Sequence, residues 1–220
     1  MKSLTQENNF LYLCLSLVLL LFSGAIMQEV SNKWADTLFA LITLLMFFVS
    51  IKSLYKDVPW IRMVSLLVIS VVILAIIERL SHFYYSKYLN LLILFVFFLH
   101  SFITVSKQIF FQGRVTLNII IGSLSLFFLI GLLWSVIYLF LLQLDPNALS
   151  GIEAQSWQQN FSRVTYYSFV TLTTLGYGDI LPTNRLTEFF AYMEAIVGLF
   201  YMAIIVASLI STREPKSKDE

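Results

Sequence analysis

The segment TLTTLGYGD, residues 171–179, constrains the structure of this 220-residue chain more than any other segment. Its two glycines, Gly176 and Gly178, stand at alternate positions, and glycine adopts left-handed backbone conformations at little steric cost. A backbone that alternates between right-handed and left-handed conformations turns successive carbonyl oxygens toward one side. Such oxygens, contributed by several subunits, can replace the water molecules around a cation.

The sequence on either side of this segment favours a membrane pore over a surface loop. A Gly-Tyr-Gly-Asp sequence by itself is typical of ordinary turns. Here an aromatic stretch with helical character, residues 161–173, comes before it, and long apolar segments lie on both sides. This order predicts a spanning helix, then a short helix and loop that do not span, and then a second spanning helix.

The composition is that of a polytopic membrane protein. Hydrophobic residues make up 59% of the chain and charged residues 12%, whereas soluble domains are about half apolar and about a quarter charged. The lipid bilayer is therefore an expected partner. A net charge of +1 without a long basic tract predicts no nucleic-acid partner. Cys14 is the single cysteine, so an intrachain disulfide is impossible.

Six apolar segments have about the 17 to 25 residues that a transmembrane helix requires. They are residues 10–27, 34–51, 60–77, 88–105, 115–142 and 186–210. Lysine and arginine near the ends of these segments are more frequent on the side of the amino terminus, which predicts that this side is cytoplasmic. We therefore predict a multi-pass protein of the cell membrane, inner or plasma, with both termini cytoplasmic and residues 161–179 entering from outside.

One alternative concerns the first segment. Ser23-Gly24-Ala25 resembles the cleavage site of a signal peptide. The apolar run before it is longer than the roughly 7 to 15 residues of a signal core, so we expect the segment to be retained.

Residues 171–179 resemble the potassium channel signature TxTTxGYGD at every signature position. The resemblance implies an all-α membrane protein of six transmembrane helices, with a re-entrant pore helix and selectivity filter between helices five and six. Potassium would be the permeant ion, and no other cofactor is expected. The residues that would coordinate K+ are Thr174, Leu175, Gly176, Tyr177 and Gly178. Leucine replaces the commoner valine at position 175, and we expect it to alter packing more than ion choice.

Several residues around the filter are expected to support it. Tyr166 and Tyr167 fall where many potassium channels have an aromatic cuff, although simple packing explains them equally well. Asp179 would lie at the outer mouth, bond to Tyr166 and attract cations, while Tyr177 would point away from the pore. Asn160 or Ser162 could cap the pore helix, whose carboxyl end favours a cation.

Two residues of the last segment stand out. Glu194 is unexpected in a spanning helix, because a carboxylate there is costly and usually faces protein or water. We expect it behind the filter, bonded to hydroxyls such as those of Thr171 or Thr173, with a purely structural hydrogen bond as the alternative. Gly198 lies where many potassium channels have a hinge glycine, although close packing explains a glycine there as well.

The chain divides into three predicted parts. Residues 1–110 would form a four-helix domain resembling a degenerate voltage sensor, residues 111–212 the pore domain, and residues 213–220 a short cytoplasmic tail. His100 is the one ionisable residue between positions 88 and 105, so we expect weak or no voltage dependence. Lys107 and Arg114 are interpreted as interfacial anchors on a linker to the pore.

Partners and rival functions follow from the single filter segment in each chain. One segment cannot enclose a pore, so the resemblance implies a homotetramer, with a separate regulatory subunit possible.

Glu78, Arg79 and His82 could form a pH-sensitive external cluster, although charges beside a span are usually just solvated. No nucleotide-binding loop or catalytic triad is present, which argues against an enzyme. The alternatives are a non-conducting subunit that modulates a partner channel and a poorly selective cation channel.

Overall fold

The structure is a computed structural model that describes residues 9–29, 41–46, 48–49, 62, 65–70, 73–74, 85–110, 116–153 and 155–211. Its helices are α1 (Asn9–Glu29), α4 (Ser86–Phe110), α5 (Leu117–Leu144), α6 (Trp157–Leu172) and α7 (Arg185–Ser211). Two short strands, β1 (Leu149–Ser150) and β2 (Leu181–Pro182), form one antiparallel ribbon. The predicted all-α class is confirmed. The predicted second and third spans, residues 34–51 and 60–77, lie largely outside the described residues.

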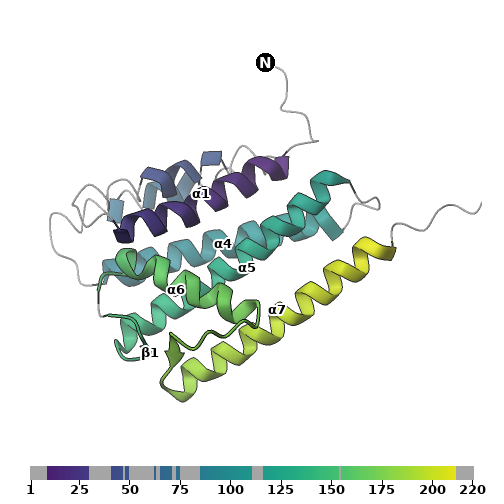
Figure 1. The fold of residues 1–220 in the computed structure, drawn as a ribbon. Helices are drawn as coiled ribbons and strands as arrows, with labels where there is room; N and C mark the ends of the chain where they lie inside the picture. The colour runs from purple at the N-terminus through teal and green to yellow at the C-terminus, as the bar shows by residue number, and fades with distance from the viewer. Residues whose placement is uncertain are drawn as a thin grey trace, which may run out of the picture.

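Helix α5 is the centre of the fold (Figure 1). It contacts α1 and α4 on one side and α6 and α7 on the other. Its first turn is capped by Thr116, whose side chain accepts a hydrogen bond from the backbone of Ile119. Its sequence is apolar on all sides, as expected of a helix that is covered by protein on one face and by lipid or protein on the other.

Three of the described helices are long and apolar enough to cross a membrane: Ser86–Ile109, Leu117–Leu144 and Arg185–Ile205. A shorter apolar helix covers Phe10–Ile26. Helix α4 continues five residues past the predicted end at position 105, so Lys107 belongs to the helix. The interpretation of Lys107 as part of a linker was therefore wrong, because the helical pattern persists through this single charged residue.

Hydrogen bonds define the directions of the helices. The Tyr88 hydroxyl at the start of α4 donates to the Gln143 carbonyl near the end of α5, at 3.0 Å. The backbone N–H of Phe10 at the start of α1 donates to Asn118 Oδ1 near the start of α5, at 3.3 Å. Helices α1 and α5 therefore run in the same direction and α4 runs in the opposite one, as the predicted order of spans requires.

Gly122 lies where α1, α4 and α5 meet. A Cβ atom at this position would lie 2.9 Å from the Phe10 ring and 3.0 Å from Cδ1 of Ile109. Phe10 is 1% exposed and Ile109 is 8% exposed, so neither side chain has open space beside it. The absence of a side chain at Gly122 therefore lets the amino-terminal helix and α4 pack directly on α5.

We predict that Gly122→Leu separates these three helices and destabilises the protein. Overpacking a tight contact costs about 1–3 kcal/mol, so the Tm of the detergent-solubilised protein should fall by several degrees. Ala25→Leu, which places the same leucine side chain at an exposed position of α1, is the control and should leave Tm unchanged. Equal Tm values for the two variants would contradict this account.

Candidate functional site

The segment between α5 and α7 enters the fold and returns to the same end. Leu149 pairs with Pro182 and Ser150 with Leu181, so the two ends of the segment lie side by side. The ribbon is reinforced by Thr183, whose N–H donates to the Ala148 carbonyl at 3.1 Å. The chain between β1 and β2, which includes α6 and residues 173–180, therefore runs in among the helices and then returns (Figure 1). We call this part of the chain the excursion.

Helix α6 begins earlier than predicted. It starts at Trp157 and not at position 161, because Ser156 is its N-cap and accepts a hydrogen bond from the backbone of Gln159 at 3.4 Å. The prediction that Asn160 or Ser162 caps this helix was wrong. Asn160 lies within the first turn, where its amide donates to the Glu153 carbonyl at 3.1 Å and holds the preceding loop.

The carboxyl end of α6 meets the middle of α7. A Cβ at Gly198 would lie 1.9 Å from the Leu172 carbonyl oxygen, so only glycine permits this contact. Gly198 is thirteen residues after the start of α7, which corresponds to about 20 Å along the axis at 1.5 Å per residue. The excursion therefore extends about half the length of a spanning helix before the chain turns back.

Residues 174–178 have an alternating backbone. The φ angles of Thr174, Gly176 and Gly178 are 58°, 56° and 80°, and the two residues between them lack positive φ. The sequence predicts this alternation at the glycines. It did not predict left-handed Thr174, since a non-glycine residue in this conformation costs about 1–2 kcal/mol.

The first turn after α6 holds this strained backbone. The N–H groups of Leu175 and Gly176 both point at the Val170 carbonyl, at 2.9 and 3.4 Å, and the Thr174 N–H donates to the Thr171 carbonyl at 2.9 Å. The last carbonyls of α6 thereby fix where the alternating segment begins. Movement of α6 would move residues 174–178 with it.

The alternating segment is open on one side in the isolated protomer. Residues 173–179 are all exposed, with Leu175 57% and Tyr177 66% exposed. A Cβ built on Gly176 or Gly178 would meet no atom within 4 Å. Residues 173–179, which include the most constrained backbone of the chain, are therefore not covered by other residues of the same protomer.

The carboxyl-terminal end of the segment is held by contacts of Tyr166. The rings of Tyr166 and Tyr177 stack with centroids 6.4 Å apart and an angle of 6° between the rings. The Tyr166 hydroxyl is hydrogen-bonded to the Asp179 carboxylate. The predicted pairing of Asp179 with Tyr166 therefore matches the geometry.

Gly151 lies between β1 and α6 and contacts the far end of the alternating segment. Its φ angle is 79°, and a Cβ there would lie 2.3 Å from the Asp179 carbonyl oxygen. Arg163 of α6 donates to the Gly151 carbonyl at 3.0 Å. Gly151 therefore holds the Asp179 end of residues 174–179 against β1. The sequence did not indicate this contact, because the two residues are far apart along the chain.

Tyr167 faces the interior and not the alternating segment. It is 5% exposed and makes an edge-to-face contact with Tyr138 of α5, at 5.0 Å between ring centroids. Its hydroxyl is hydrogen-bonded to the Thr171 side chain. The arrangement of Tyr167 is that of a packed core residue, the second of the two interpretations that the sequence left open.

Glu194 lies behind α6, but with other partners than expected. Its Oε1 is 2.5 Å from Ser168 Oγ, and its Oε2 is 2.6 Å from the Tyr138 hydroxyl. The expected bonds to Thr171 or Thr173 were wrong. Thr173 instead donates to the Phe169 carbonyl at 2.6 Å. The error has a physical cause: Ser168 is on the side of α6 that faces α7, and the sequence did not show how α6 is rotated.

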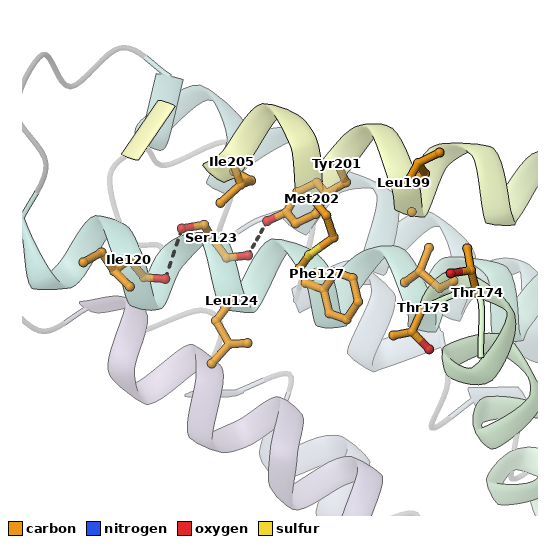
Figure 2. Close-up of a pocket in the computed structure, with 12 residues that line it drawn as sticks. Ile120, Ser123, Leu124, Phe127, Thr173, Thr174, Leu199, Tyr201, Met202 and Ile205 are labelled. Atoms are coloured by element: carbon orange, nitrogen blue, oxygen red, sulfur yellow. Dashed lines mark hydrogen bonds between the residues drawn. The ribbon is translucent and has the colours of Figure 1, made fainter. Parts of the chain in front are cut away.

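A pocket of about 430 Å³ opens below the alternating segment, between α5 and α7. Figure 2 shows Thr173 and Thr174 at one end, with Phe127 of α5 facing Met202 of α7. At the other end the Tyr201 hydroxyl donates to the Ser123 carbonyl. The pocket is almost entirely apolar, apart from the two threonines beside the alternating segment and the polar groups at its far end.

Comparison with known proteins finds one family model and short matches to individual proteins. Residues 118–213 match the sequence model of a family described as "Ion channel". Two-pore potassium channel 3 and Two-pore potassium channel 2 of Arabidopsis thaliana are 37% and 35% identical to this chain over 46 residues. Each match covers 21% of this chain, and the two cover 11% and 10% of the respective relatives. No solved structure matches the chain.

The contact at Gly198 leads to a test of whether this glycine serves close helix packing or acts as a hinge. If the residue serves close packing, Gly198→Ala forces α7 away from the end of α6 and lowers the free energy of unfolding by about 1–3 kcal/mol. If the residue serves only as a hinge, alanine stabilises the helix by about 0.8–1 kcal/mol. We expect a lower Tm for Gly198→Ala. A higher Tm together with a changed open probability would favour the hinge.

Proposed function

We propose that this chain belongs to the potassium channel superfamily and conducts K+ passively through a selective pore. The observation that carries the proposal is the alternating backbone at Thr174, Gly176 and Gly178 within a complete signature sequence. A row of carbonyls facing one way replaces the hydration shell of K+. Transport would follow the electrochemical gradient, and no cofactor or enzymatic step is needed.

In this proposal the carbonyls of residues 174–178 and the Thr174 hydroxyl form the ion sites. Asp179 concentrates cations at the outer mouth. Leu175 and Tyr177 contribute carbonyls while their side chains pack away from the ions. The carboxyl end of α6 carries a negative partial charge and favours a cation at the inner end of the filter.

A homotetramer would complete the pore. The exposed side of residues 173–179 requires neighbouring copies, because a single row of oxygens cannot surround an ion. Helix α7 supports the same conclusion, since its exposed face is rich in large apolar side chains. These include Leu186, Phe189, Ile196, Leu199, Phe200 and Met202. Four copies related by a four-fold axis would cover part of this face and line the pore with the rest.

We further propose that residues 150–181 form a re-entrant pore loop on the outer side of the membrane, with both termini cytoplasmic. The return of the chain to the β1–β2 ribbon supports this topology, because it places both ends of the loop on one side. The amino-terminal helices would surround the pore as a domain without a steep voltage sensor, and gating could involve a separate regulatory subunit. Arg114 and the cluster Glu78, Arg79 and His82 lie outside the described residues.

The proposed function is tested by the reversal potential of the purified protein in planar bilayers under opposed K+ and Na+ gradients. We expect a value close to the K+ equilibrium potential. Gly176→Ala should abolish selective current, because alanine is strained at a φ of 56°. Leu175→Val restores the commoner residue, serves as the control and should retain selectivity.

Two other outcomes would contradict the proposal. A reversal potential between the K+ and Na+ values would indicate a poorly selective cation channel. No current from a folded tetramer over a wide range of voltage and pH would favour a non-conducting subunit that modulates a partner channel.

A further inference from the structure

The buried carboxyl group of Glu194 lies in the middle of α7, directly behind α6. The residue is fully buried, with 0% exposure. Its two oxygens face hydroxyl groups, and no cationic side chain among the described residues forms an ion pair with it. An ionised carboxylate without a cation is costly in such surroundings, because protein dipoles must replace all of its hydration.

The hydrogen atoms of this cluster can be counted. Ser168 Oγ is 2.5 Å from Glu194 Oε1 and 2.8 Å from the Gly131 carbonyl oxygen. If Glu194 were ionised, both neighbours would be pure acceptors, and the one hydrogen of Ser168 could serve only one of them. The other short oxygen–oxygen contact would then contain no hydrogen.

A protonated Glu194 satisfies every contact. The Tyr138 hydroxyl donates to Oε2 at 2.6 Å, Oε1–H donates to Ser168, and Ser168 donates to the Gly131 carbonyl. Each hydroxyl hydrogen is used once, and the bonds form one continuous chain. Such chains strengthen their members when every donor and acceptor is paired.

We propose that Glu194 is a neutral carboxylic acid that positions the filter, by joining α7 to α5 and α6 through this chain of hydrogen bonds. The proposal rests on the proposed function, since a filter must exist to be positioned. Ser168 lies on α6 two residues before Val170, whose carbonyl binds the N–H groups of Leu175 and Gly176. The orientation of α6 set by Glu194 is therefore transmitted directly to the ion sites.

The titratable groups around Glu194 are compatible with this assignment. Tyr138 faces it from α5, and Tyr167 of α6 packs edge-to-face on Tyr138. Among the described residues of α7 no other titratable group faces it. Loss of the proton would remove one hydrogen bond of the chain and place a negative charge between three neutral oxygens.

The protonation state is tested by infrared difference spectroscopy of the tetramer in lipid at neutral pH. We expect the carbonyl stretch of a protonated carboxylic acid in the parent protein, shifted by deuterium exchange and absent from Glu194→Gln. The absence of any such difference would overturn the assignment of a neutral acid. This measurement needs no conduction, so it remains valid even if the proposed channel activity fails.

The positioning role is tested by single-channel recording of matched variants. In Glu194→Gln the amide keeps an acceptor for Tyr138 and a donor for Ser168, so open probability and reversal potential should stay at the parent values. Ser168→Ala removes the central link without creating a buried charge. We expect it to change the ratio of open to closed channels about tenfold. This change is equivalent to about 1.4 kcal/mol, the free energy that a typical hydrogen bond contributes.

Glu194→Ala removes both hydrogen bonds that join α7 to α5 and α6, and it should have a larger effect than Ser168→Ala. If Glu194→Ala does not assemble, Ser168→Ala still decides the question. Parent-like open probability and selectivity in Ser168→Ala would overturn the positioning role, and so would loss of selectivity in the isosteric Glu194→Gln.

Discussion

The close contact between the end of α6 and the middle of α7 is the constraint on which the site depends. The Leu172 carbonyl occupies the space that a side chain at Gly198 would need. This contact determines how deep the excursion from β1 to β2 reaches and where the alternating backbone begins. Two N–H groups of that backbone bind the Val170 carbonyl. A methyl group added at Gly198 would therefore displace α6 and move the backbone of the proposed ion sites with it.

Two further anchors hold the excursion in place. Beside the strands Gly151 lies against the Asp179 backbone, and the β1–β2 ribbon closes the loop. Behind it, Glu194 joins α7 to Ser168 of α6 and Tyr138 of α5. The three anchors surround α6 and leave residues 173–179 open on one face. A strained, left-handed Thr174 is tolerated because its surroundings are fixed in this way.

The sequence predicted the elements better than their contacts. The apolar runs identified α1, α4, α5 and α7 to within a few residues at each end, because the length of a spanning helix is a strong signal. The boundary of α6 was missed by four residues, since the helix is short and its start depends on the Ser156 cap. The partners of Glu194 were also missed, because both Thr171 and Ser168 are hydroxyl residues on α6 and only its rotation distinguishes them.

The sequence alone determined that the backbone alternates at Gly176 and Gly178, because glycine permits conformations that other residues avoid. It also determined that the chain is apolar enough to occupy a membrane. The tertiary structure decided what holds that backbone: the space at Gly198 for a carbonyl, the place of Gly151 beside Asp179, and the chain of hydroxyls around Glu194. These are contacts between segments far apart in the sequence, and their geometry depends on helix rotation and depth, which local composition does not encode.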